Sequence, residues 1–282
     1  MYTEQTRFRM RRKVSIYLAL ASLLLTATCR KPFQYSLLEV RPLDRDLNIK
    51  AIEQIRQLSP KENFTLLFIS DSQIGVNELK DFVSHANKTY SNDEISFVLH
   101  GGDITDFGAN YEYNDYYKYT KELKFPVVAT IGNHDMLGNG PEIYKQYFGP
   151  ENFTFDYGVN RFIVFNSNSR ERKFDGKTPD LDWIAEEINK ADDIPTVRNI
   201  FYLSHVPPSS DDFDPDLIPG FSRLLSSTPK ARLSMNGHVH SFNLSEPFED
   251  GLTYVTTPAI HSRSYVKIYI EGEHVTVHNI FY

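Results

Sequence analysis

Continuous apolar runs alternate with amphipathic stretches along most of the chain, from residue 44 to residue 236. The continuous runs predict buried strands, whereas apolar residues spaced three or four positions apart predict helices. The predicted strands span residues 64–70, 95–100, 127–131, 153–157, 161–166, 199–204 and 231–236. The predicted helices span residues 44–58, 77–88, 111–124 and 180–190, and one more lies between the last two strands. The β-α-β-α-β order of residues 64–131 predicts a parallel sheet with strands buried on both faces.

The C-terminal part, residues 252–281, has a different pattern. Alternation such as V-K-I-Y-I and H-V-T-V-H predicts strands with one buried face, and we expect them to form a β-meander. No internal repeat and no linker interrupts the chain after residue 60. We therefore expect residues 61–282 to form one domain.

The first 28 residues are basic and then apolar. The basic stretch R-F-R-M-R-R-K at 7–13 precedes an apolar run at 14–28, which is short for a membrane-spanning helix and typical of a secretory signal. Cys29 follows directly and is the only cysteine, so no disulfide can form within the chain. We expect residues 1–28 to be a signal peptide and residues 29–60 a lipid-anchored tether with a short helix. The protein would then be exported, as a periplasmic or outer-membrane lipoprotein of a bacterium; the alternative is a simple signal or uncleaved anchor with an incidental cysteine.

The charge balance excludes one class of partner. The chain has a formal charge of −7, and removing residues 1–28, which hold five basic residues and one acidic residue, leaves −11. An acidic body of this kind lacks the basic surface needed to grip duplex nucleic acid. A small phosphoester remains compatible with it, because bound metal ions can reverse the local field.

Polar side chains follow five of the predicted strands. The sequences after these strands are S-D-S-Q at 70–73, G-G-D-I-T-D at 101–106, G-N-H-D at 132–135, S-H at 204–205 and G-H-V-H at 237–240. In parallel α/β sheets ligands bind outside the carboxyl ends of the strands, so these side chains are expected to converge. Carboxylate and amide oxygens mixed with imidazoles describe a dinuclear site for Mn, Fe, Zn or a similar ion. One carboxylate can bridge two ions about 3.5–4 Å apart.

The ordered series D-x-Q, G-D-x-x-D, G-N-H-D, H and G-H-x-H over residues 71–240 resembles the calcineurin-like metallophosphoesterase superfamily. The resemblance implies an α/β fold, a four-layer α/β/β/α sandwich of two mixed β-sheets flanked by helices. It also implies hydrolysis of a phosphoester through a metal-bridging hydroxide. Carried over by position, it assigns the first ion to Asp71, Gln73 and His240, the second ion to Asn133, His205 and His238, and the bridging position to Asp103.

Gln73 departs from this family, most of whose members have histidine there. An amide oxygen is a harder and weaker ligand than imidazole, which favours Mn²⁺ or Mg²⁺ over Zn²⁺ in the first site. We expect two divalent ions with Mn²⁺ favoured, although Gln73 as a surface amide would leave room for only one. His134, beside Asn133 but free of metal, is expected to protonate the leaving oxygen or to stabilise charge on it, and Asp106 is expected to orient His134 and favour its protonated form. The purple acid phosphatases have tyrosine at the position of Asp106, so we expect no iron–tyrosinate centre.

The sequence thus predicts an exported, metal-dependent phosphoesterase acting on a small phosphoester. A phosphodiester is favoured because the short chain has no large cap and its motifs resemble those of the small phosphodiesterases. One alternative is a phosphomonoesterase. The other is a metal- or phosphate-binding lipoprotein with little turnover, against which His134 and Asp106 argue because a binder has no use for a general acid.

Three further features are interpreted as structural. The acidic run D-D-F-D-P-D at 211–216 is interpreted as a solvated loop rather than as a wall of the substrate entrance. The tyrosines of residues 111–119 are interpreted as a helix face packed on the sheet rather than as a stacking platform. His261 is interpreted as a surface residue, although the loop before it would allow it to line the cleft.

Overall fold

The computed structural model describes residues 13, 16, 17 and 39–282. All elements named below belong to the unit formed by residues 37–282. Cys29, residues 30–38 of the expected tether, and all of the expected signal peptide except residues 13, 16 and 17 lie outside the described residues. Among the described residues, no helix is both long and apolar enough to cross a membrane.

Two mixed β-sheets form the centre of the fold. The first sheet has the strand order β11-β10-β1-β2-β3. Its strands are β1 (Asn63–Ile69), β2 (Ile95–His100), β3 (Val127–Ala129), β10 (Ser264–Glu271) and β11 (His274–Phe281). The parallel β1, β2 and β3 confirm the β-α-β-α-β prediction, and β10 pairs antiparallel with β1 on the side away from β2.

The second sheet has the strand order β4-β5-β6-β7-β9-β8. Its strands are β4 (Phe153–Tyr157), β5 (Asn160–Val164), β6 (Asn199–Leu203), β7 (Ala231–Asn236), β8 (Asn243–Ser245) and β9 (Thr253–Thr256). Strands β5, β6, β7 and β9 run parallel, whereas β4 and β8 are antiparallel edge strands.

The predicted C-terminal β-meander is wrong. Strand β9 pairs with β7 in the second sheet, whereas β10 and β11 form a hairpin in the first sheet. The segment between β9 and β10, which includes the short helix η2 (Ile260–Ser262), therefore passes from one sheet to the other. Alternation of apolar residues reports that a strand has a buried face, but not which of two sheets it joins.

The main core lies between the two sheets. Leu66 and Phe68 of β1 face it on alternate positions, while Leu67 between them faces the helices. On the opposite sheet the rings of Phe155 and Phe162 stack with centroids 4.7 Å apart and planes 8° apart. Phe97 of β2 meets both rings edge to face from the first sheet, with centroids 5.9 Å and 5.4 Å away, so aromatic contacts join the two sheets.

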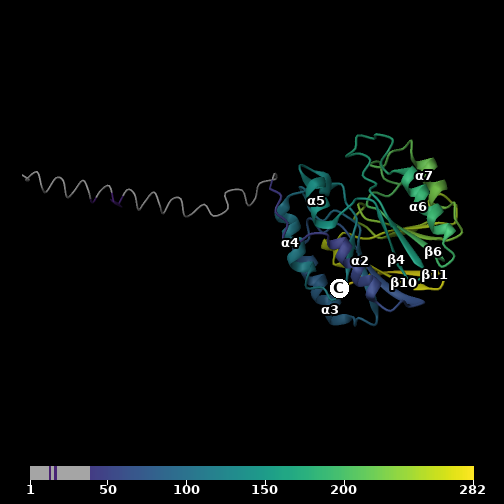
Figure 1. Ribbon diagram of the computed structural model, residues 1–282, viewed down its shortest axis with the longest axis horizontal. Coiled ribbons are helices and arrows are strands. Elements are labelled where there is room, and N and C mark those ends of the chain that lie inside the picture. The colour runs from purple at the N-terminus through teal and green to yellow at the C-terminus, as the bar shows by residue number, and fades with distance from the viewer. Residues whose placement is uncertain (1–12, 14–15, 18–38) are drawn as a thin grey trace, which may run out of the picture. The chain divides into compact units, whose positions relative to one another are not determined.

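Helices cover both outer faces, which confirms the predicted four layers. Helices α3 (Val76–Thr89), α4 (Asn110–Thr120) and α5 (Gly140–Phe148) lie on the left of the sheets in Figure 1, and α6 (Leu181–Asp193) and α7 (Ile218–Leu225) on the right. Helix α5 was not predicted, although Pro141 at its start and buried Ile143, Tyr144 and Tyr147 are an ordinary helix signal. On α4, Tyr113 and Tyr116 are buried, as the predicted packed face requires.

Helix α2 (Leu47–Gln57) lies in the segment that the sequence assigns to the tether. Its Ala51, Ile52 and Ile55 belong to the inter-sheet core. Its Asn48 side chain donates to the carbonyl of Ala129 and accepts from the amide of Ala129, both at 2.8 Å. Helix α2 therefore covers the edge strand β3, whose backbone it hydrogen-bonds through Asn48, and is part of the packed domain.

Candidate metal centre

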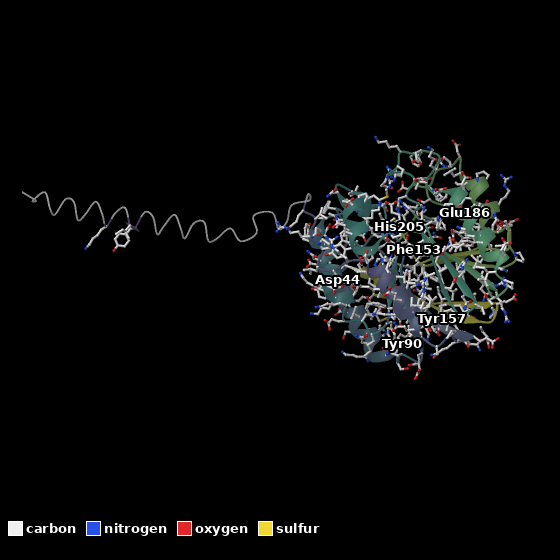
Figure 2. All side chains as sticks on the ribbon, in the orientation of Figure 1. Asp44, Tyr90, Phe153, Tyr157, Glu186 and His205 are labelled. Carbon is white, nitrogen blue, oxygen red and sulfur yellow. The ribbon has the colours of Figure 1, made fainter. Side chains whose placement is uncertain are left out.

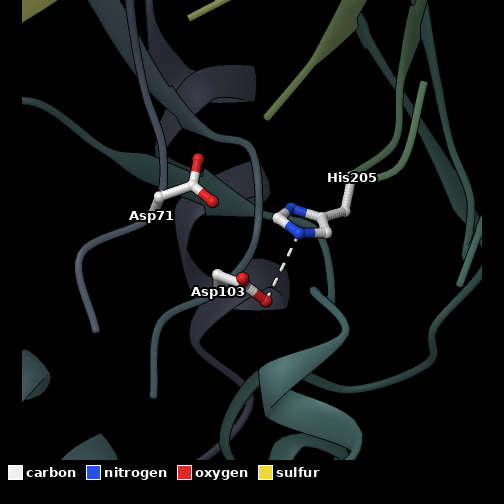
Figure 3. Close-up of side chains that lie close together, drawn as sticks. All are labelled: Asp71, Asp103 and His205. Carbon is white, nitrogen blue, oxygen red and sulfur yellow. Dashed lines mark ion pairs between the residues drawn. The ribbon is translucent and has the colours of Figure 1, made fainter. Parts of the chain in front are cut away.

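The side chains predicted for the site follow the carboxyl ends of β1, β2, β3, β6 and β7, so both sheets contribute to one edge of the sandwich. His205 lies toward the upper end of the sheets in Figure 2, away from Tyr157 of the inter-sheet core. The three most central groups are Asp71, Asp103 and His205, whose ligand atoms all lie within 4.8 Å of one another in a buried cluster (Figure 3). Two carboxylates and an imidazole at this spacing could hold a metal ion.

One half of the site surrounds His205. Its Nδ1 donates to the carbonyl of Gly101 at 2.7 Å, which leaves Nε2 as the atom facing the site. That Nε2 lies 3.3 Å from Asp103 Oδ1 and 2.9 Å from Asn133 Oδ1. Nδ1 of His238 lies 3.1 Å from the same Asn133 oxygen. The four residues expected around the second ion therefore present their donor atoms to one another.

The other half surrounds Asp71. Nε2 of His240 lies 3.2 Å from Asp71 Oδ1, and Nε2 of Gln73 lies 3.4 Å from Asp103 Oδ2. Oε1 of Gln73 is buried and has no hydrogen-bond partner among the described residues. A buried acceptor without a donor is costly, and a cation would satisfy it. The residues present, including Gln73, therefore fit a pair of oxygen-preferring divalent ions.

Four of the seven expected ligands have left-handed backbone conformations. The φ angles are 55° at Asp71, 55° at Asp103, 70° at His238 and 58° at His240. Such φ values are uncommon for residues other than glycine and cost roughly 1–3 kcal/mol each where the residue is strained. They turn the chain sharply after each strand, and so direct the side chain across the edge of the sheets.

Two glycines permit the close approach of these turns. A Cβ at Gly132 would lie 2.0 Å from the amide nitrogen of Asp103, and a Cβ at Gly237 would lie 2.1 Å from Ser70 Oγ. Any larger residue would push the ligand-bearing loops apart.

Asp135, the last residue of G-N-H-D, holds two loops together. Its buried carboxylate accepts hydrogen bonds from the amides of Ile104, Thr105 and Gly132 at 2.9–3.1 Å, and from the Thr105 hydroxyl at 2.8 Å. Burial, with the nearby charge of Asp103, raises the pKa of Asp135 to about 6. The sequence analysis gave this residue no role; its position beside His134 was the only signal for one.

Burial and neighbouring charges shift the pKa values of the buried groups in the cluster. Burial alone would lower the pKa of His205, but Asp103 raises it to about 9. Burial alone would raise the pKa of Asp103, yet His205 and His134 leave it lowered. The pKa of His100 falls to about 3 because that ring is buried and faces His205, so His100 is a neutral strand-end residue. The site therefore attracts positive charge to its carboxylates, as a cation site requires.

His134 and Asp106 lie together at the edge of the cluster. His134 Nδ1 donates to the backbone carbonyl of Asp106 at 2.9 Å and lies 3.2 Å from the Asp106 carboxylate. The backbone amide of His134 also donates to Asp103 Oδ1 at 2.9 Å. Although burial opposes it, the Asp106 carbonyl and the carboxylates of Asp103 and Asp106 raise the pKa of His134. The predicted pairing of these two residues is thus present.

The sequence analysis missed Asp212, which it assigned to a solvated acidic loop. Asp212 Oδ2 lies 3.2 Å from His238 Nε2, and Asp212 Oδ1 accepts from Arg170 Nη1 at 2.6 Å. A carboxylate on the outer nitrogen of a metal-binding histidine fixes its ring and tautomer. The interpretation of the 211–216 run as solvent-facing was therefore wrong at this position, where a neighbour 26 residues along the chain gave no sequence signal.

His261, which the sequence analysis interprets as a surface residue, lies close to His240 of the candidate site. Its ring centroid is 6.0 Å from that of His240, and the two rings meet edge to face.

Comparisons with known proteins agree with this geometry. A family model described as calcineurin-like phosphoesterase matches residues 64–242, which include all nine predicted site residues. A curated protein of *Arcobacter nitrofigilis*, named probable glycerophosphodiester phosphodiesterase GpdQ, is 28% identical over 117 residues. That match covers 39% of this chain and 41% of the relative, so the chain matches less than half of that relative's length.

Solved structures share the fold at low identity. A dimetal phosphatase from *Danio rerio* superposes with a TM-score of 0.62 and 13% identity, over 78% of this chain and 96% of that chain. GAP50, the anchor in the inner membrane complex of *Plasmodium*, gives a TM-score of 0.60 at 12% identity, over 78% and 85%. At such identities these likenesses bear on the fold alone.

Proposed function

The chain belongs to the calcineurin-like phosphoesterase family, and from this premise we propose that it is a metal-dependent phosphodiesterase. The observation that carries the proposal is the convergence of Asp71, Asp103 and His205 within 4.8 Å at the edge shared by the two sheets. Around them, Asn133, His238 and His240 add donor atoms, and Gln73 has a buried amide oxygen without a hydrogen-bond partner.

Asp103 is the residue shared by the two halves of the site. One of its carboxylate oxygens faces His205 and the other faces Gln73. Divalent ions held there would supply stabilisation of the negative charge on the phosphoryl group and an activated water. The unpartnered Gln73 oxygen supports a hard ion in the first position, and we propose Mn²⁺ as the ion that supports the highest activity.

His134 supplies the proton in this proposal. Its Nδ1 is occupied by Asp106, so its Nε2 is the nitrogen available to the leaving oxygen. Although burial opposes it, the neighbouring Asp106 carbonyl and the carboxylates of Asp103 and Asp106 raise the pKa of His134, which makes the protonated ring more favourable than in a free imidazole. As the bond between phosphorus and the leaving oxygen breaks, that oxygen takes the Nε2 proton. The hydroxyl group from water remains on phosphorus, its other proton passes to solvent, and His134 regains a proton from solvent, which gives a phosphomonoester and an alcohol.

The distribution of cationic residues favours a diester over a monoester. No Lys or Arg lies within three residues, along the chain, of any of the nine predicted site residues. Arg170, which comes close through Asp212, is already paired. A phosphomonoester carries about two negative charges at neutral pH and profits most from such residues. A diester carries one charge and needs them less; the curated relative that matches 117 residues is also named as a phosphodiesterase.

Hydrolysis of bis-p-nitrophenyl phosphate and of p-nitrophenyl phosphate by the full chain with added Mn²⁺ tests the proposal. The key variant is Asp103→Asn, because asparagine tolerates the left-handed backbone of this position while losing the charge. Asp156→Asn, which removes an acid from an exposed ion pair with Arg161 on β4 and β5, is the control.

We expect Mn²⁺-dependent turnover that prefers the diester, collapses in Asp103→Asn and persists in Asp156→Asn. A preference for the monoester would replace the proposal by the phosphomonoesterase. Metal binding without turnover of either ester would replace it by the binding protein.

We also propose that the protein is exported and held at a membrane by a lipid on Cys29. The support is the basic run at 7–13, the apolar run at 14–28 and the single cysteine that follows them. Mass spectrometry of the N-terminal peptide from membrane-extracted protein tests it. A chain that begins at an acylated Cys29 is expected, and an unmodified Cys29 thiol would contradict the proposal.

A further inference from the structure

Exposed apolar side chains gather on the loops of the candidate metal centre. Within residues 39–282, eleven large apolar residues are strongly exposed, and six of them lie within three residues of a predicted site residue. We call these six the apolar rim: Ile74, Val76, Phe107, Leu137, Val239 and Phe242. Singly exposed apolar residues are ordinary, but a collection around one site marks a binding surface.

One part of the rim lies beside the proposed proton donor. Phe107 follows Asp106 and is 52% exposed, and Leu137 is 41% exposed just after the turn that holds His134. The two loops touch, because a Cβ at Gly108 would lie 2.4 Å from the carbonyl oxygen of Leu137. Apolar surface therefore flanks the side of the site where the leaving oxygen would take its proton.

The other part lies beside the ligands expected for the first ion. Ile74 follows Gln73 and is 56% exposed, and Val239, 45% exposed, separates the two histidines of G-H-V-H. A Cβ at Gly75 would lie 3.0 Å from the amide of His261, and the ring of His261 approaches His240. Hence the loops that carry Ile74 and Val239 meet across the segment that contains His261.

The rim lies outside the packed interior of the fold. None of its residues belongs to the three buried cores, so their exposed apolar surface is available for a ligand. The absence of Lys and Arg from the same loops also points away from a substrate that is highly charged beyond its phosphodiester.

We propose that the apolar rim binds a hydrocarbon substituent of the substrate, which is therefore an amphiphilic phosphodiester with a single negative charge at phosphorus. This inference rests on the proposed phosphodiesterase function and names its substrate class. The occupant is a part of the substrate because the rim residues are neighbours, along the chain, of the residues proposed to bind and protonate it.

A series of alkyl p-nitrophenyl phosphates from methyl to octyl, supplied to the full chain with Mn²⁺, tests the inference. Complete burial of a methylene group strengthens binding about fourfold, and contact on one side about twofold. We expect kcat/KM to rise about twofold per methylene. The alkyl chain stays on phosphorus while p-nitrophenolate leaves, so the rise should flatten in Val239→Ser/Phe242→Ser, which lie away from the proton donor. It should remain in the control Phe281→Ser, which removes an exposed apolar residue of the edge strand β11 outside the rim.

The outcomes separate this inference from the proposed function. Turnover of the methyl ester with no dependence on chain length would overturn the amphiphilic substrate and leave the phosphodiesterase standing. No turnover of any member would overturn the phosphodiesterase itself. Two further results would also overturn the inference. One is that the rim variants lose binding to phosphatidylcholine vesicles without a change in chain-length dependence. The other is that light scattering shows a dimer that the rim variants lose. The first would assign the rim to a membrane surface, and the second to another copy of the chain.

Discussion

The proton donor can be tested by replacing His134 and Asp106 separately. The variant His134→Gln removes the imidazole but keeps the backbone amide that donates to Asp103. General acid catalysis contributes about 10²–10⁴-fold, so kcat for a diester with a poor, aliphatic leaving group should fall at least about 100-fold. With p-nitrophenol, which leaves well without a proton, the same variant should lose much less.

The variant Asp106→Asn should have a much smaller effect. The backbone carbonyl of Asp106 still accepts from His134 Nδ1 at 2.9 Å, and only the carboxylate at 3.2 Å is changed. The side chains of His134 and Asp106 are 36% and 33% exposed, so solvent screens their interaction. Exposed ion pairs contribute about 0.2–1 kcal/mol, and kcat for the poor leaving group should therefore fall no more than about fivefold.

The assay measures kcat for both leaving groups at saturating Mn²⁺, and metal content by mass spectrometry in each variant. Equal losses for good and poor leaving groups in His134→Gln would refute a role in protonation. A loss in Asp106→Asn as large as that in His134→Gln would refute the view that the backbone carbonyl holds the ring. A change in metal content would assign the effect to the ions instead.

Three other predictions concern the ions and the loops that hold their ligands. In calorimetric titration at limiting Mn²⁺, Gln73→Ala should bind one ion where the unchanged chain binds two. Gln73→His should bind Zn²⁺ more tightly than the unchanged chain. Tight binding of two ions by Gln73→Ala would contradict ligation by Gln73. Asp212→Asn should lower the affinity for one ion about 10–100-fold, because it frees the His238 ring. Arg170→Ala removes only a partner of Asp212 and should lower that affinity less than about fivefold. Gly132→Ala should lower the free energy of unfolding by about 3 kcal/mol, because the new Cβ would lie 2.0 Å from the amide nitrogen of Asp103. The Tm should fall by about 6–12 °C even with excess chelator. An unchanged Tm would show that the loops can move apart.

The fold was largely predictable because most of its elements are specified locally. The predicted strand at 95–100 coincides with β2, and the one at 199–204 matches β6 to within one residue, since buried parallel strands read as largely continuous apolar segments. The sheet to which β9 belongs was not predictable in this way. Its pairing with β7 depends on the crossing at residues 257–263, and that crossing leaves no periodic signal.

The central site residues were predictable for a different reason. Each ligand candidate directly follows a strand, and the ends of parallel strands meet at one edge whatever the details of packing. Asp212 and Arg170 were not predictable, because they reach His238 from loops between other elements. Their position depends on tertiary packing that a single sequence does not reveal.

The strained backbone at the site indicates what the edge of the sandwich is selected for. Of the nine non-glycine residues with positive φ among those the structure describes, four are expected ligands. At roughly 1–3 kcal/mol each, holding four strained residues costs on the order of 4–12 kcal/mol, which is comparable with the net stability of a domain. The compensating bonds are made by the protein itself: Asp135 joins the loops of Asp103 and Gly132, and the Gly101 carbonyl orients His205. Because these bonds are made within the protein, Asp103 and His205 are oriented by the fold itself, and binding of ions need not supply the free energy that orders these two loops.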